Sequence, residues 1–218
     1  MDAVFSQLVS LGSSGMLLTA LIVLWRKSLP AYINAYRWQS WLLAALTATI
    51  GYFGGEPQLY WVALALAALK GVAIPMLLRA MQRRFGARAE TSPYLNTETS
   101  LLVAGLLVLF AYVLARPWMM VSQLPTRQGL PLATALLFVS LFIIVTRKKA
   151  ITQVIGFLML ENAIALLAAA GTYGVPLLVE LGVVLDALMG FLVMQIFVYQ
   201  IHETFDTIDV EQLTRLRH

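Results

Sequence analysis

The sequence predicts an all-α integral membrane protein with seven transmembrane helices. Hydrophobic residues make up 60% of the 218 residues, and only 12% are charged. Soluble domains usually carry about 25% charged residues, so the chain is too apolar for that class. Helices are expected because the apolar runs lack the strict alternation of a membrane barrel, and lipid offers no partner to an open backbone.

Each predicted span is a mainly apolar run of about 20 residues, the length that a helix needs to cross roughly 30 Å of hydrocarbon. The first run begins with Asp2 and ends in Trp25-Arg26-Lys27, unlike a cleavable signal peptide, which starts with a basic region. The fifth run is the shortest. The predicted spans are 3–25, 34–53, 58–79, 97–116, 130–146, 150–171 and 176–200.

The connections between these runs predict the orientation in the membrane. Basic residues concentrate in alternate connections, and the positive-inside rule assigns that side to the cytoplasm. The N-terminus is therefore expected outside the cell and the C-terminus in the cytoplasm. The predicted cytoplasmic side has Arg26, Lys27, Arg37, Arg79, Arg83, Arg84, Arg88, Arg147, Lys148, Lys149, Arg215 and Arg217, and the opposite side has Arg116 and Arg127.

Composition also limits the chemistry. The chain has no cysteine, and its two histidines, His202 and His218, fall in the predicted tail. Disulfides, thiolate-bound zinc, iron–sulfur clusters and buried haem ligation are therefore not expected, and no cofactor is predicted. The net charge of +4 does not indicate nucleic-acid binding, because the basic residues are spread over short connections between membrane spans.

Ionisable residues inside the predicted spans are the candidate functional residues. Glu161 lies about 16 Å from the cytoplasmic start of its predicted helix. Lys70 lies about 18 Å and Asp186 about 15 Å from the outer starts of their predicted helices. The connection 172–176 is short, so the helices of Glu161 and Asp186 are expected to be antiparallel neighbours. Charged groups at such depth usually face the bundle interior, pair with one another or line a proton path. Glu180, nearer the outer surface, is a weaker fourth candidate.

Each candidate also has a structural interpretation. Glu161 could join helices by hydrogen bonds together with Asn162, and Asp186 could pair with a lysine of a partner subunit. Lys70 could extend its side chain to the cytoplasmic interface near Arg79. Glu180 could be an ordinary interfacial residue. Pro75, five residues after Lys70, predicts a kink near that lysine.

The C-terminal part, roughly 130–217, resembles the three-helix K subunit of respiratory complex I and the C subunit of multisubunit sodium/proton antiporters. The residues that carry the resemblance are Gly156, Asn162-Ala163, Asp186-Ala187 with Gly190, and Ile208-Asp209-Val210. The resemblance implies a relay role for Asp186, where the K subunit also has an acidic residue. The other membrane glutamate of the K subunit would fall at Leu158, and Glu161 stands three positions later, on nearly the same helix face.

Nearly the whole chain is similar to component E of hydrogenase-4, a membrane subunit of formate hydrogenlyase-type and other group 4 [NiFe] hydrogenase complexes. The similarity is carried by the segment from Lys70 to Pro75, LMLEN at 158–162, LVELG at 178–182 and the ending from Asp209 to Arg217. It implies a subunit without a redox centre that lies beside antiporter-like subunits in the cytoplasmic membrane of a prokaryote. Residues 1–129 would then be a four-helix extension, and 130–218 the K-subunit-like unit.

Three functions are compatible with these observations. The first is a non-redox subunit of an oxidoreductase complex that helps couple electron transfer to proton or sodium translocation through Glu161, Asp186, Lys70 and Glu180. The second is a structural linker that clamps antiporter-like subunits together. A stand-alone transporter is the third, and it is the least favoured because the sequence shows no second, inverted half.

Overall fold

The computed structural model describes residues 2–84, 94–121 and 124–172 of the chain. The chain divides into two compact units, Met1–Val183 and Val184–His218, and every described residue belongs to the first. Within the described residues all regular structure is helical. The predicted seventh span, 176–200, lies outside them.

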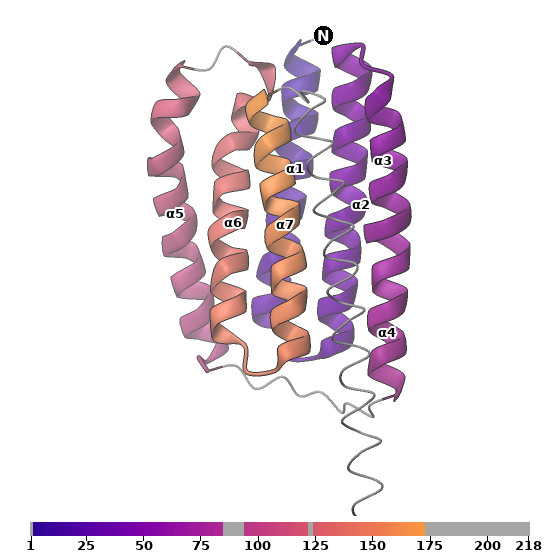
Figure 1. Cartoon of the computed structure of the whole chain (residues 1–218). Coiled ribbons are helices and arrows are strands. Elements are labelled where there is room, and N and C mark those ends of the chain that lie inside the picture. Colours follow the sequence, from indigo (N-terminus) through magenta and orange to yellow (C-terminus); the bar gives the residue numbers. More distant parts are fainter. Residues whose placement is uncertain (1, 85–93, 122–123, 173–218) are drawn as a thin grey trace, which may run out of the picture. The chain divides into compact units, whose positions relative to one another are not determined.

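Most successive described helices pack as antiparallel neighbours, but the helix Ile74–Arg84 continues the helix before it and lies on the far side of the bundle from the next helix, Thr97–Val121 (Figure 1). Short connections at 26–28, 55–57 and 147–149 force successive helices to pack side by side. The elements are α1 (Asp2–Trp25), α2 (Leu29–Gly54), α3 (Gln58–Ala68), the π-helical η1 (Leu69–Ala73), α4 (Ile74–Arg84), α5 (Thr97–Val121), the 3₁₀ turn η2 (Pro125–Gln128), α6 (Gly129–Thr146) and α7 (Ala150–Thr172).

A described helix lies at the position of each of the first six predicted spans. The predicted span 34–53 begins earlier, at Leu29, where Pro30 occupies one of the first helical positions and its missing N–H is tolerated. Arg37 therefore lies inside α2 and not in the connection to which the loop-charge count assigned it. The end of α2 is set by Gly55, whose φ of 70° is the left-handed conformation typical of a helix C-terminus.

The chain is a multi-pass membrane protein. Five of the described helical segments are long and apolar enough to cross a bilayer: Val4–Trp25, Gln58–Arg83, Thr97–Val121, Pro125–Thr146 and Ile151–Thr172. The 26-residue α2 is also long enough to span, but Gln39, Ser40 and several aromatic residues make it less apolar than these five.

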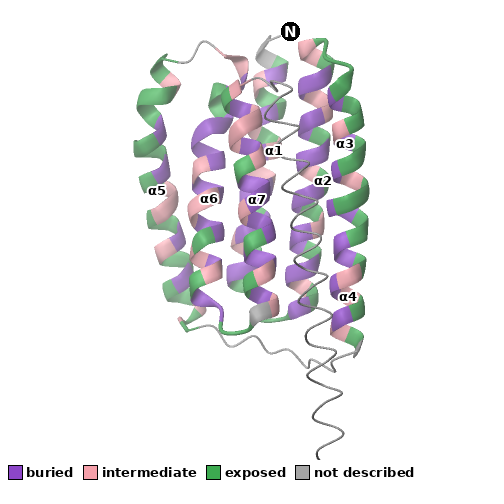
Figure 2. Ribbon diagram, in the orientation of Figure 1, coloured by how far each residue is buried: buried purple, intermediate pink, exposed green. Residues whose placement is uncertain are grey.

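Helices α1, α2, α6 and α7 pack around the core, with α3 and η1 against α2, and α5 against α6. Buried positions face this interior and exposed positions face outward along each helix (Figure 2). The helix α5 is the most exposed, and its outward residues, such as Leu102, Leu109 and Val113, are apolar. Such a surface is expected to contact lipid.

Candidate functional site

Lys70 lies in the π-helical segment η1, which joins α3 to α4. The backbone N–H of Ile74 donates to the carbonyl of Leu69, five residues earlier, which is the bond that defines a π-turn. Pro75 follows at once, and its missing N–H together with its bulky ring disfavours regular α-helix over the preceding turn. The predicted disturbance near Lys70 is therefore present, as a widened turn. Gly71 allows close packing, since a Cβ there would lie 3.1 Å from Nε1 of Trp41.

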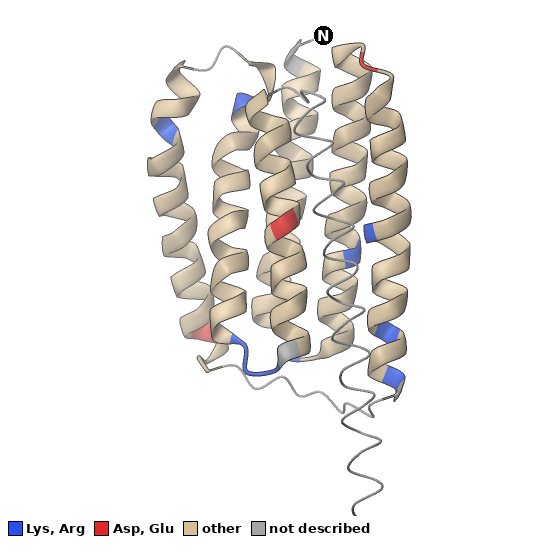
Figure 3. Cartoon of the chain, in the orientation of Figure 1, with Lys and Arg blue, Asp and Glu red and all other residues tan. Residues whose placement is uncertain are grey.

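Glu161 lies midway along α7 and reaches Lys70 across the bundle. Lys70 Nζ lies 3.4 Å from Glu161 Oε2, and the exposed fractions of the two side chains are only 1% and 3%. The two halves of the pair come from elements far apart in sequence but at one depth, as the helical rise predicted. Charged residues are otherwise sparse along the helices and are concentrated at one end of the described bundle (Figure 3).

Asn162 is the second partner of Lys70. The ammonium Nζ donates to Asn162 Oδ1 at 3.2 Å. The amide nitrogen of Asn162 points the other way, to α2, where it donates to Gln39 Oε1 at 3.1 Å and to Ser40 Oγ at 3.2 Å. Lys70 is thus held by two adjacent residues of α7, and that helix is joined to α2 by the same amide.

The polar network continues from α2 into α1. The amide nitrogen of Gln39 donates to the carbonyl of Met16 and to Thr19 Oγ1, both at 3.3 Å. Thr19 donates to the same Met16 carbonyl at 2.6 Å, and Ser40 donates to the carbonyl of Tyr36 at 3.0 Å. The buried polar network therefore joins α1, α2, η1 and α7; its side chains are Thr19, Gln39, Ser40, Lys70, Glu161 and Asn162, and all six are buried.

A buried lysine–glutamate pair can do two things. It can stabilise the helix arrangement, because each charge offsets the cost of placing the other in an apolar interior. It can also exchange a proton, since one proton moved from the ammonium to the carboxylate converts the charged pair to a neutral one. None of the side chains in the network is redox-active. Among the described residues, no group of three or more His, Cys, Asp or Glu is placed to hold a metal.

The structure brings together two of the four predicted site residues, Lys70 and Glu161. The alternative in which Lys70 extends to the cytoplasmic interface is wrong, because Lys70 is fully buried and Arg79 instead donates to Asn34 Oδ1 at 2.6 Å. Asp186 and Glu180 lie outside the described residues.

Three members of the network were not predicted from the sequence: Thr19, Gln39 and Ser40. The available signal was weak. Gln39 is a neutral polar residue in a helix interior, and such residues are often hydrogen-bonding partners between membrane helices. Its neighbours in sequence, Trp38 and Trp41, are instead typical of a helix end at the membrane interface.

A second buried cation lies at the opposite end of the bundle from η2. Arg147, the residue after α6, is 1% exposed; its Nη2 donates to the carbonyl of Val23 at 2.9 Å, and its guanidinium lies 5.1 Å from the ring centre of Tyr32. Burial lowers the pKa of Arg147, and Tyr32 opposes that shift. An arginine nevertheless stays charged in proteins, so Arg147 places a fixed positive charge at the C-terminal end of α1, where the helix dipole favours it.

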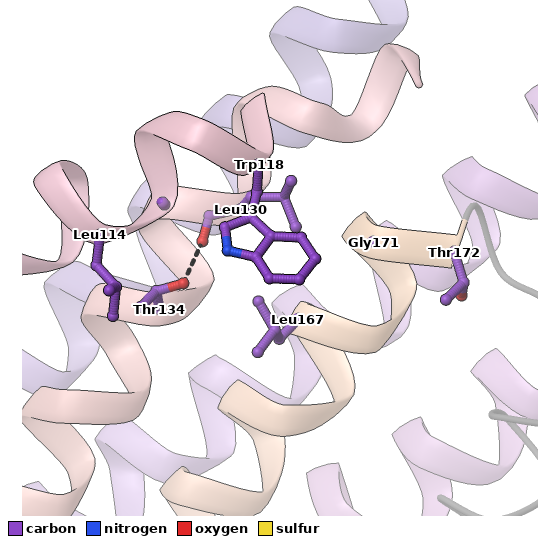
Figure 4. A pocket seen from close by; sticks show the side chains of 8 residues that line it. Leu114, Trp118, Leu130, Thr134, Leu167, Gly171 and Thr172 are labelled. Atoms are coloured by element: carbon purple, nitrogen blue, oxygen red, sulfur yellow. Dashed lines mark hydrogen bonds between the residues drawn. The ribbon is translucent and has the colours of Figure 1, made fainter. Parts of the chain in front are cut away.

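The described helices also border an open cavity of about 430 Å³ between α5, α6 and α7 (Figure 4). It lies toward the Gly171 end of α7, about 15 Å along the helix from Glu161. Its hydroxyl groups bond to their own helices: Thr134 to the carbonyl of Leu130 at 2.9 Å, and Thr172 to that of Ala168 at 2.7 Å. The cavity is separate from the polar network and is lined by Leu114, Ala115, Trp118, Leu130, Thr134, Leu167, Gly171 and Thr172.

Comparison with known proteins places the chain in a family. The chain is 35% identical over 217 residues to the uncharacterized protein Rv0085 of Mycobacterium tuberculosis, and the match covers 99% of each chain. The chain belongs to the family of this protein. It is also homologous to hydrogenase-4 component E of Escherichia coli K12, with 28% identity over 203 residues, which is 93% of this chain and 94% of that one.

Hydrogenase-4 component E of Shigella flexneri matches to the same extent. The predicted similarity to the hydrogenase-4 component E family is therefore confirmed, and it extends over nearly the full length of the relatives. No family model matches the chain, and no solved structure matches it.

Proposed function

We propose that the chain is a membrane subunit of a hydrogenase-type complex and contributes to coupling electron transfer with proton or sodium translocation. The membrane character of the chain and its homology to hydrogenase-4 component E support the first part. The observation that carries the second part is the Lys70–Glu161 ion pair, buried midway along the helices. A membrane protein places such a pair in its interior at considerable cost, which favours a functional role.

In this proposal the chain holds no redox centre, and electrons stay in partner subunits. Glu161 and Lys70 form one station of a charged path through the bilayer. Asp186 and, less directly, Glu180 would extend that path on the helix predicted at 176–200, as the similarity to the complex I K subunit implies. The large partners would be antiporter-like membrane subunits, which continue the path beyond this chain.

The proposed topology completes the assignment. Seven helices would cross the cytoplasmic membrane of a prokaryote, with the N-terminus outside and the C-terminus in the cytoplasm, as the distribution of basic residues favours. Residues 1–129 would form the four-helix extension and 130–218 the K-subunit-like unit. The ion pair then joins the two, with Lys70 from the extension and Glu161 from the unit.

A structural linker is the second candidate function. The observation that favours it is the density of hydrogen bonds around the pair: Asn162 alone bonds to Lys70, Gln39 and Ser40. A buried hydrogen-bonded network rigidifies a core whether or not protons move through it.

Substitution of the buried acid separates the two functions. Glu161→Gln keeps the size and hydrogen-bonding capacity of the side chain but removes the exchangeable charge. We expect the complex to assemble while ion uptake into membrane vesicles, measured per electron transferred, falls. Asp186→Asn should act in the same direction. The matched control is Glu98→Gln, because Glu98 is an exposed acid in the first turn of α5.

Wild-type ion uptake per electron in the Glu161→Gln complex would overturn the coupling role. Loss of subunits from the purified complex, with normal coupling in the fraction that stays intact, would establish the linker function instead. The two results are distinguished by quantifying each subunit in the same vesicles that are assayed for ion uptake.

A further inference from the structure

Gln39 lies at the centre of the polar network, and Asn162 links it to Lys70. It bonds to Asn162 on one side and to Met16 and Thr19 on the other. We infer that Gln39 is a positioning residue that fixes the direction of the Asn162 amide and so holds the ammonium of Lys70 against Glu161. This inference rests on the proposed function and adds a residue to it.

The direction of the Gln39 amide is set by a backbone carbonyl. The oxygen of Met16 can only accept a hydrogen bond, so the side-chain atom of Gln39 that faces it must be the nitrogen. Thr19 donates its single hydroxyl hydrogen to the same carbonyl, so Thr19 Oγ1 must accept a hydrogen bond from the second N–H of Gln39. Both hydrogens of the Gln39 amide therefore bond to α1, and the amide oxygen must face α7.

The Asn162 amide is set in the same way. Gln39 Oε1 requires a donor, which the nitrogen of Asn162 supplies at 3.1 Å. Ser40 donates its hydroxyl hydrogen to the carbonyl of Tyr36, so Ser40 Oγ accepts the second N–H of Asn162. The oxygen of Asn162 therefore has one orientation, toward Lys70 Nζ, and a flipped amide would present N–H groups to the ammonium.

The consequence is a division of roles within the network. Lys70 always donates one hydrogen to Asn162, and the proton available for exchange lies toward Glu161. A neutral amide whose donors are all engaged does not pass protons on, so the path does not run through Asn162 and Gln39. These two residues anchor Lys70, and they do so from the Met16 carbonyl of α1.

Gln39→Met tests this role in the assembled complex, because methionine matches glutamine in length but makes no directed bonds of this kind. We expect ion uptake per electron to fall about tenfold, because an Asn162 amide that is no longer fixed by Gln39 can flip and lose its hydrogen bond from the charged Lys70 ammonium. Thr47→Val is the matched control: Thr47 is also buried in α2, but its hydroxyl bonds only to the Leu43 carbonyl of its own helix. That variant should keep wild-type coupling.

A second variant gives a pH readout. In Gln39→Glu a protonated carboxyl reproduces one donor and one acceptor, whereas the ionised form offers only acceptors to the Met16 carbonyl. Coupling should therefore be retained at acidic pH and lost as the pH rises through the titration of the new carboxyl. The wild-type profile lacks this loss, because glutamine does not titrate. If Gln39 only filled space, Gln39→Glu would not lose coupling as the pH rises.

The outcomes separate the inference from the function on which it rests. Normal coupling in Gln39→Met, in a complex where Glu161→Gln loses coupling, overturns the positioning role and leaves the proposed function standing. Normal coupling in Glu161→Gln overturns the proposed function itself. If Gln39→Met does not assemble, the Gln39→Glu profile decides, and a profile that follows the wild type at every pH overturns the inference.

Discussion

The Lys70–Glu161 pair is the residue-scale feature on which the function depends. A charged side chain at the centre of a membrane helix costs about 2.5–3.5 kcal/mol on insertion scales. The two charges lie 3.4 Å apart in a site that excludes solvent, so each offsets much of the cost of the other. Removing one member should therefore do more harm than removing both.

A double-mutant cycle tests that expectation. Lys70→Met and Glu161→Gln should each lower the thermal unfolding temperature of the purified chain in detergent. The double variant should be more stable than the sum of the two single effects predicts, with an interaction free energy of about 1 kcal/mol or more. Lys149→Met, at an exposed position outside the network, serves as control. Strictly additive effects would show that the two side chains are not coupled.

At the scale of the elements, close helix packing holds this site together. The α6–α7 contact is among the most extensive in the bundle, and Gly156 permits it. A Cβ at Gly156 would lie 3.0 Å from side-chain atoms of Ile143 and Ile144 and 3.2 Å from the backbone nitrogen of Ile144. The backbone cannot retreat as a flexible side chain can, so α6 and α7 would have to separate.

Gly156→Val should therefore destabilise the chain by about 1–3 kcal/mol, the usual cost of overpacking. Gly105→Val is its control, because a Cβ at Gly105 has no atom within 4 Å and both glycines lie within long helices. The change in helix propensity is then the same in both variants, and the difference between their thermal unfolding temperatures reports the α6–α7 contact. Equal unfolding temperatures would contradict this account of Gly156.

The elements themselves could largely be predicted from the sequence, while their contacts could not. A run of about 20 apolar residues is a local signal, so most ends of the first six predicted spans lie within a few residues of the ends of the observed helices. Depth is equally local, because it follows from the rise per residue. The positions of Lys70 and Glu161 along their helices were therefore enough to predict that they lie at similar depths.

The partners of the pair depend on how each helix is rotated and which helix lies beside it. Gln39 and Asn162 are 123 residues apart, and no local pattern links them. Apolar residues surround these membrane helices on all sides, so the usual amphipathic stripe does not reveal the buried face. The π-turn at Lys70 adds a further rotation that regular helical spacing does not anticipate.

At the scale of the whole molecule, the positive-inside rule makes a prediction about topology. Because the chain has no cysteine, single cysteines can be introduced without interference. Glu56→Cys and Gln128→Cys should react with a membrane-impermeant maleimide on intact cells, whereas Lys27→Cys and Lys149→Cys should react only after the membrane is opened. All four positions are exposed and lie between long described helices. The reverse labelling pattern would invert the proposed orientation.

The distance in sequence between Lys70 and Asn162, 92 residues, also imposes an order on biosynthesis. A ribosome adds about 5–20 residues per second, so Lys70 leaves it roughly 5 to 18 s before Asn162 does. During that interval the helix that carries Lys70 must reside in the insertion machinery or the bilayer without Asn162 and without the neighbouring acid Glu161. We therefore expect the nascent chain to be most vulnerable to quality-control proteases before α7 is made.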